Sequence, residues 1–257
     1  MLLFDAGNSR CKWAWTENGA WLRQGVLGNA DDAAWLELKN SFAQLEEPKK
    51  ILVSNVAGAE VARKLHDLCA VWGCTAQFIE AQPAQCGVRN AYEGPAQLGS
   101  DRWAAMIAAW HHVRQACLVV NCGTATTVDA LSATGEFVGG LILPGVELMQ
   151  RSLLDNTAQL DAAKNGFVPG ELRDFPRNTQ DAILSGTMRA TAGAIQHQYR
   201  LMAAQQGVQC IISGGAAGSL LPYLGLAAEQ VDNLVLRGMQ IIGQDCAAIT
   251  TRETVAR

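Results

Sequence analysis

The N-terminal stretch places an acidic side chain where an apolar run meets a turn of small residues. Leu2-Leu3-Phe4 is typical of a buried strand, and Asp5 follows it directly, just ahead of Gly7-Asn8-Ser9. A carboxylate at a strand end can hold a hydrated Mg²⁺, and a glycine lets backbone N–H groups approach the oxygens of a phosphate. The same residues also make ordinary turns, so this stretch alone leaves both interpretations open.

A second stretch repeats this pattern in the other half of the chain, again after an apolar run. Three positions correspond in the two stretches: Asp5 with Asn121, Gly7 with Gly123, and Asn8 with Thr124. A third glycine-rich strand end, at Gly214-Gly215, follows near the C-terminus and could hold a nucleoside. Two phosphate turns in two half-chains predict a duplicated domain, with a nucleotide in the cleft between the halves.

Phosphoryl transfer also requires a carboxylate that orients the attacking hydroxyl group. Asp101 is the candidate, because it lies at the expected start of an apolar helix, where backbone N–H groups are free. The neighbouring Arg102 could bind an anionic substrate. The alternative is that Asp101 only caps the helix and that Arg102 is a solvated neighbour, and the residues alone leave both open.

Length, composition and charge limit the class of protein. The chain has 257 residues, of which 49% are hydrophobic and 17% charged, so it can fold around a full core. A net charge of −4 gives no electrostatic reason to expect nucleic-acid binding. No apolar run is long enough to span a membrane, and Met1 leads directly into a core strand. We therefore expect a soluble, cytoplasmic protein.

The eight cysteines form no Cys-x-x-Cys motif, and most lie in apolar segments. Cys69 and Cys74 could be imagined as metal ligands, but no histidine or second pair stands at a suitable spacing. The sequence therefore predicts reduced, mostly buried thiols.

In the first half, apolar periodicity and turn residues predict a mixed sheet covered by helices. Asn18-Gly19 is a strong hairpin signal between strands at 12–15 and 21–26. Further elements are expected in this order: a helix from Asp31 or Asp32 to about Leu45, a strand at 51–54, a helix at 59–72 and a strand at 75–79. A long connection, 80–98, then leads to an apolar helix that begins near Ser100 and ends by about Gln115.

The second half echoes this order, which places the domain boundary near residue 116, with domains 1–116 and 117–257. The expected elements are strands at 126–131 and 136–143, a helix from Pro144-Gly145 to about Leu154, an irregular stretch at 155–177, a helix at 179–205, strands at 209–213 and 231–236, and a last helix from about Gly238.

Several segments resemble motifs of one enzyme family. Asn90–Arg102, with the sequence NAYEGPAQLGSDR, resembles the substrate motif of type III pantothenate kinases. Other segments that look like motifs of that family are Asp5–Ser9, Asn121–Thr127, Gly139–Gly145, and Asn178-Thr179 ahead of Ala182-Ile183 and Gly186. The resemblance runs in order over nearly the whole chain.

This resemblance implies an α/β fold of the duplicated actin-like, ribonuclease-H-like type, shared by acetate kinase, sugar kinases, Hsp70 and actin. It also implies a homodimer that phosphorylates pantothenate with ATP to 4′-phosphopantothenate, the first step of coenzyme A synthesis. Mg²⁺ with ATP and a monovalent cation, K⁺ or NH₄⁺, are the implied cofactors.

The resemblance also implies a role for individual residues. The first phosphate turn would comprise Asp5, Ala6, Gly7, Asn8, Ser9, Arg10, Cys11 and Lys12, with Thr124 a contact in the second turn. Pantothenate would be held by Tyr92, Gly99, Ser100, Asp101 and Arg102. Asp101 would accept the proton of the reacting hydroxyl group, and Thr179 would reach the pantothenate site of the neighbouring subunit.

One residue departs from the family pattern. Many members carry aspartate where this chain has Asn121, a position linked to a monovalent-cation site. Neutral Asn121 still offers an oxygen ligand, without the charge. Two other functions remain open: a kinase of the same fold that acts on another small acid or sugar, and a non-catalytic accessory protein of virulence-gene transcription. Intact Asp5, Thr124 and Asp101 favour catalysis.

Overall fold

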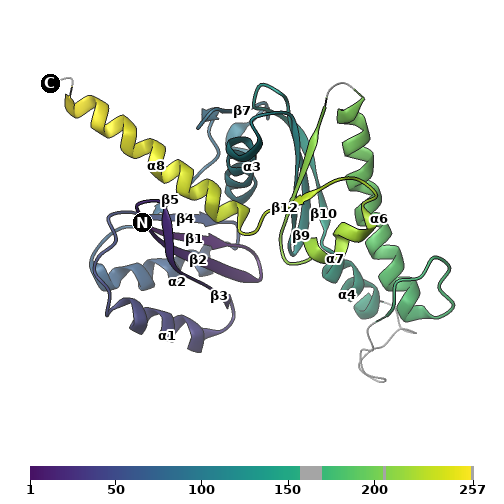
Figure 1. The fold of residues 1–257 in the computed structure, drawn as a ribbon. Helices are drawn as coiled ribbons and strands as arrows, with labels where there is room; N and C mark the ends of the chain where they lie inside the picture. Colours follow the sequence, from purple (N-terminus) through teal and green to yellow (C-terminus); the bar gives the residue numbers. More distant parts are fainter. Residues whose placement is uncertain (157–169, 205–206, 256–257) are drawn as a thin grey trace. The chain divides into compact units, whose positions relative to one another are not determined.

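The computed structural model describes residues 1–156, 170–204 and 207–255, which form two compact units (Figure 1). The first comprises Met1–Arg114, Gly135–Val138 and Asn233–Arg257; the second comprises Gln115–Thr134 and Gly139–Asp232. The C-terminal segment thus groups with the first unit. The division into domains 1–116 and 117–257 stays a prediction, and part of the irregular stretch expected at 155–177 lies outside the described residues.

The first unit is built on a five-stranded sheet of order β3-β2-β1-β4-β5. Its strands are β1 (Leu2–Ala6), β2 (Arg10–Glu17), β3 (Ala20–Gly28), β4 (Ile51–Asn55) and β5 (Gln77–Phe78). Strand β1 is antiparallel to β2 and parallel to β4. The predicted hairpin is confirmed, because Asn18 and Gly19 both have positive φ, as its two-residue turn requires.

Helices α1 (Asp32–Phe42) and α2 (Ala59–Cys69) cover one face of this sheet (Figure 1). Asp31 is the N-cap of α1, since its carboxylate accepts the backbone N–H of Ala34 at 3.0 Å. Apolar residues of both helices and of β1 and β4 form one core, in which Phe42 contacts the rings of Phe4 and Trp13. These elements agree with the sequence expectations.

Helices α3 (Ser100–Val113) and α8 (Leu234–Val255) pack closely together in the first unit. A Cβ at Gly238 would lie 1.8 Å from the carbonyl oxygen of Ala104, so only glycine permits this approach. The predicted strand at 231–236 is wrong: α8 begins at Leu234, and the nearby strand is limited to β12 (Glu229–Gln230). The run Leu234–Leu236 buries its side chains at the start of this helix instead.

The connection expected at 80–98 contains short regular elements. These are β6 (Ala84–Gln85), β7 (Val88–Asn90) and a 3₁₀ turn at Pro95–Gln97. Strand β7 is antiparallel to β6 and pairs in parallel with Glu136 and Phe137, at the start of β10 (Glu136–Pro144). This pairing brings Phe137 beside the segment that leads into α3.

The second unit contains strands in the order β12-β11-β8-β9-β10. Its further elements are β8 (Cys117–Cys122), β9 (Ala125–Leu131), α4 (Val146–Asn156), α6 (Thr179–Ala203), β11 (Gln209–Ser213), α7 (Ala217–Leu220) and a 3₁₀ turn at Leu221–Tyr223. Met188, Ala192 and Ile195 of α6 pack in the core of this unit against β8 and β11. The apolar content of α6 is thus accounted for by packing within one chain.

The two units repeat one local topology. Strand β8 is antiparallel to β9 and parallel to β11, as β1 is to β2 and β4. Matching hydrogen bonds follow: the Val56 N–H donates to the Ala6 carbonyl at 3.0 Å, and the Ala216 N–H donates to the Cys122 carbonyl at 3.2 Å. Ala6 and Cys122 are equivalent when Asp5 is aligned with Asn121, so this geometry supports the duplication.

Candidate functional site

The first turn follows β1 in the first unit. The Gly7 N–H donates to the Arg10 carbonyl at 3.1 Å, which closes the turn before β2. Asn8, Ser9 and Arg10 are exposed, so their side chains and main chain are accessible to a ligand. Ala6 and Cys11 are buried in the core, and any contact they make with a nucleotide must therefore use the main chain. Lys12, the last residue of the expected turn, is paired with Asp5 in the strand register.

Two buried serines join the strand beside Asp5 to the start of the helix that carries Asp101. Asp5 faces Ser54 across the parallel pair of β1 and β4, and the Ser54 and Ser100 hydroxyl oxygens are 2.9 Å apart. Ser100 opens α3, so the hydroxyl pair fastens the first turn of this helix to the strand beside β1. Asp101 follows immediately, with its Oδ1 accepting the backbone N–H of Arg102 at 2.8 Å.

Gly99 makes room for this conformation of Asp101. A Cβ at position 99 would lie 2.6 Å from Oδ1 of Asp101, although the glycine itself has an ordinary backbone conformation. A larger residue would push the carboxylate away from the Arg102 N–H. Gly99 thus leaves the space that the Asp101 carboxylate occupies; its contact with substrate stays a prediction.

Both carboxylates resist ionisation in the folded protein. Burial and then the negative charge of Asp101 raise the pKa of Asp5 to about 7, and Lys12 opposes this shift. Burial also raises the pKa of Asp101 above its ordinary value, opposed by the hydrogen bond from the Arg102 N–H and by the Arg102 charge. A carboxylate with a raised pKa is a stronger proton acceptor, and two coupled carboxylates attract a cation.

Arg102 packs beside two neighbouring aromatic rings. Its guanidinium lies 5.7 Å from the ring centroids of both Tyr92 and Phe137, and its Nη1 donates to the Tyr92 hydroxyl oxygen at 3.1 Å. The two rings are 5.1 Å apart. Although Arg102 is only 5% exposed, its planar fork is fixed beside Asp101, an arrangement suited to a carboxylate ligand.

The second turn follows β8 in the second unit. The Gly123 N–H donates to the Ala125 carbonyl at 3.0 Å, and the Gly145 N–H donates to the Thr124 carbonyl at 2.8 Å. Asn121, near the end of β8, lies opposite Thr127 and Ser213 in the two neighbouring strands. At the third turn, Gly214 has a φ of +99°, and a Cβ there would lie 2.4 Å from the Cys122 carbonyl oxygen.

Thr179 is the first residue of α6 and lies at a cavity in the second unit. The cavity has a volume of about 600 Å³ and is lined by Leu153, Pro176, Arg177, Asn178, Thr179, Ala182 and Ile183. Asn178 caps the helix, since its Oδ1 accepts the Asp181 N–H at 2.9 Å. The hydroxyl group of Thr179 is thus presented from a rigid helix start, which sequence reasoning placed correctly.

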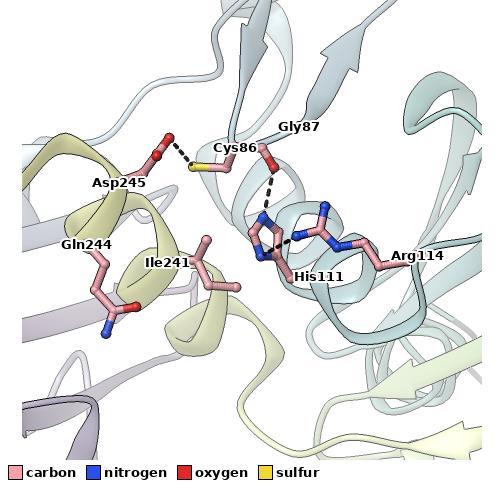
Figure 2. Close-up of a pocket in the computed structure, with 7 residues that line it drawn as sticks. All are labelled: Cys86, Gly87, His111, Arg114, Ile241, Gln244 and Asp245. Atoms are coloured by element: carbon pink, nitrogen blue, oxygen red, sulfur yellow. Dashed lines mark hydrogen bonds between the residues drawn. The ribbon is translucent and has the colours of Figure 1, made fainter. Parts of the chain in front are cut away.

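Another cavity, of about 540 Å³, lies in the first unit and contains none of the expected site residues (Figure 2). Arg114 donates to Nδ1 of His111 at 3.1 Å, so the His111 Nε2 carries the proton and donates to the Cys86 carbonyl at 2.9 Å. The Cys86 thiol donates to Asp245 at 3.3 Å. These hydrogen bonds join the β6–β7 turn to α3 and to α8. The polar groups of this cavity therefore stabilise the packing of the C-terminal helix.

Metal-binding clusters are absent from the described part of the chain. It contains no group of three or more His, Cys, Asp or Glu side chains that could hold a metal ion. The seven cysteines with described side chains are free thiols, most of them buried, as predicted; Cys246 lies outside these described side chains. Within the described residues, no helix combines the length and apolar character needed to cross a membrane.

The family model described as type III pantothenate kinase matches residues 1–201. A type III pantothenate kinase of Nitrosospira multiformis is 45% identical over 100% of this chain and 95% of its own length. That of Aromatoleum aromaticum is 46% identical over 96% of this chain and 99% of its own. The chain belongs to the type III pantothenate kinase family.

Solved structures confirm the fold expected for a type III pantothenate kinase. A 2-dehydro-3-deoxygalactonokinase-like protein of Sinorhizobium meliloti superimposes with a TM-score of 0.58 at 15% identity, covering 95% of each chain. A structure described as a Baf family transcriptional activator from Campylobacter jejuni gives 0.54 at 22% identity, covering 96% of this chain and 100% of that one. At these identities the likeness establishes the actin-like kinase fold alone.

Three residues that border the expected site of this type III pantothenate kinase were not predicted from the sequence. Ser54 reads as part of an apolar strand, and Phe137 as an ordinary strand residue. Asn29 lies between β3 and α1, and its side chain contacts the first turn. Asn29 lies just ahead of the N-cap Asp31, and in the sequence this polar segment indicated only the start of a helix.

Proposed function

We propose that the protein transfers the γ-phosphoryl group of ATP to the terminal hydroxyl group of pantothenate. The hydroxyl oxygen forms the new bond to phosphorus, the bond to the β–γ bridging oxygen breaks, and ADP leaves with that electron pair. The hydroxyl proton passes to a protein carboxylate. The products are ADP and 4′-phosphopantothenate, and the proposed place of the reaction is the cytoplasm.

The placement of Asp101 is the observation that carries this proposal. Its carboxylate lies at the start of a buried helix, is fixed by the Arg102 N–H and has a raised pKa. A proton acceptor is most effective when its pKa approaches the working pH. Asp101 is therefore the proposed base, and Arg102, packed beside Tyr92 and Phe137, is the proposed partner of the pantothenate carboxylate.

The first turn supports the assignment of ATP. Its exposed main chain follows Asp5, and its N–H groups can bind anionic oxygens. A divalent cation fits at Asp5, because a bound cation relieves the unfavourable charge coupling of Asp5 with Asp101; it would neutralise the β- and γ-phosphates. Asn121 is a proposed ligand for K⁺ or NH₄⁺ through its amide oxygen. Thr124 is a further proposed ATP contact.

The proposed active form is a homodimer in which Thr179 completes the pantothenate site of the partner subunit. Support comes from the position of Thr179 at a helix start beside an open cavity in its own unit. The residue is exposed there, so a second chain can reach it.

The test is incubation of the protein with MgATP, K⁺ and pantothenate, followed by detection of phosphopantothenate by mass spectrometry. Asp101→Asn is the matched control, since it keeps the size of the side chain but removes the proton acceptor. Product from the wild type and about 10²–10⁴-fold less from the variant supports the proposal. Folded protein that binds ATP but phosphorylates only another small acid, or nothing, contradicts it.

A further inference from the structure

Asn29 contacts three successive carbonyl groups of the first turn, those of Gly7, Asn8 and Ser9. Its side-chain Nδ2 donates to the carbonyl oxygens of Gly7 at 2.7 Å and of Asn8 at 3.0 Å. Its backbone N–H donates to the carbonyl oxygen of Ser9 at 3.1 Å. One residue from the β3–α1 junction thus fixes three successive peptide groups of a turn that lies some twenty residues earlier in the chain.

This contact fixes where the N–H groups of the turn point. In a trans peptide the C=O and the following N–H lie in one plane and point in opposite directions, and the described chain has no cis peptide bond. When Asn29 holds the Gly7 and Asn8 carbonyls, the N–H groups of Asn8 and Ser9 are directed away from it. The Gly7 N–H, in contrast, donates to the Arg10 carbonyl and closes the turn.

The second unit holds the equivalent carbonyl by a different group. Thr124 corresponds to Asn8, and its carbonyl oxygen accepts the backbone N–H of Gly145 at 2.8 Å. A Cβ at Gly145 would lie 2.2 Å from the Gly123 carbonyl oxygen, so this support needs glycine. A side chain in one unit and a main-chain N–H in the other therefore do the same work, which indicates that the orientation of this peptide group matters.

The hydrogen bonds of the Asn29 side chain go to the turn. Its Oδ1 is buried and has no hydrogen-bond partner among the described residues, so within them the side chain bonds only through Nδ2. The backbone carbonyl of Asn29 accepts a hydrogen bond from the Lys64 ammonium group at 2.8 Å, which further fixes the position of the residue.

We propose that Asn29 is a positioning residue for nucleotide binding: it directs the Asn8 and Ser9 N–H groups toward phosphate oxygens of ATP. The proposal rests on the proposed function only in taking ATP as the ligand of this turn. Asn29 itself contacts the turn and not the ligand.

Two substitutions and one matched control test this role. Asn29→Asp keeps the shape of the side chain but replaces the donor by a carboxylate oxygen that faces two carbonyls, and Asn29→Ala removes the side chain. Asp31→Ala is the control, because it removes the N-cap of the adjacent α1 without touching the turn. The measurements are binding of the non-hydrolysable analogue AMP-PNP with Mg²⁺ by calorimetry, and KM for ATP and for pantothenate.

Both Asn29 variants are expected to weaken AMP-PNP binding and raise KM for ATP by about tenfold or more, because two hydrogen bonds that orient the donors are lost. KM for pantothenate should stay within about twofold, a split that general destabilisation does not produce. Unchanged AMP-PNP binding in the Asn29 variants, or an equal loss in Asp31→Ala, overturns the proposal.

A measurement on the wild type covers the case in which the variants do not fold. On addition of AMP-PNP with Mg²⁺, the backbone amide NMR signals of Asn8 and Ser9 should shift more than that of Gly7. Equal or smaller shifts at Asn8 and Ser9 overturn the proposal. AMP-PNP binding without phosphorylation of pantothenate contradicts the proposed function alone and leaves this test intact.

Discussion

Replacement of Asp5 by asparagine should stabilise the nucleotide-free protein at neutral pH. The pKa of Asp5 is raised from 3.8 to about 7, so ionisation is penalised in the folded state. The difference of about three pKa units corresponds to about 4 kcal/mol in the free energy of unfolding. Because Asp5 is partly exposed, solvent screening reduces this value, and we expect a measured gain of about 1–3 kcal/mol for Asp5→Asn.

The pH dependence gives this prediction its sign. Between about pH 4 and pH 7 the folded protein keeps a proton on Asp5 that the unfolded chain has released, so the stability of the wild type falls as the pH rises. The loss is complete about one pH unit above this pKa, at about pH 8. Asparagine cannot ionise, and the advantage of Asp5→Asn should therefore grow from near zero at about pH 4 to its full value at about pH 8.

Tryptophan fluorescence is a selective probe for this experiment. All seven tryptophans lie between Trp13 and Trp110, within the first unit, which also contains Asp5. Urea unfolding would be followed from pH 5 to pH 8 in EDTA without nucleotide, with exposed Asp67→Asn as the matched control. In an Asp101→Asn background the gain should be smaller, because the Asp101 charge is the second cause of the shift. An advantage that does not change with pH, or a less stable variant at pH 8, would refute the reasoning.

Three further outcomes are expected. Asp101→Asn should lower kcat about 10²–10⁴-fold with AMP-PNP binding intact; near-normal turnover would return Asp101 to the role of a helix cap. The protein should sediment as a dimer, and mixing inactive Asp101→Asn with inactive Thr179→Ala should restore part of the activity through mixed dimers. No recovery after subunit exchange would exclude a shared site. Asn121→Asp should lower the K⁺ concentration for half-maximal activation, because hard cations bind charged oxygens more tightly; identical midpoints would show that position 121 is not a ligand.

Local signals predicted most elements of this fold. Asn18-Gly19 determines its hairpin by backbone conformation alone, and Asp31 caps α1 through one hydrogen bond. The strand expected at 231–236 failed because an apolar run of that length fits a buried strand and a buried helix start equally well. The close approach of Gly238 to Ala104, which holds α8 in place, is a contact between distant segments that local pattern does not contain.

The candidate site also contains residues that could be predicted from the sequence and residues that could not. Asp5 and Asp101 could be selected because their residue types and flanking turns suggest chemistry. Ser54, Phe137 and Asn29 could not, because each contributes only through a partner fixed by tertiary structure: the Ser100 hydroxyl, the Arg102 guanidinium and the turn carbonyls. Such supporting residues have no local signature, so they became visible only when the strands were placed side by side.

The position of α8 in the first unit has a consequence for synthesis on the ribosome. Residues Met1–Arg114 emerge first, yet the helix that packs against α3 is made only after the second unit. At about 5–20 residues per second, the 119 residues from 115 to 233 take roughly 6–24 s to translate. During that interval α3 lacks its partner, while the second unit is being synthesised. The unit that contains Asp5 and Asp101 is therefore completed after the second unit, and a nascent chain truncated before Leu234 should expose the apolar face of α3 to chaperones.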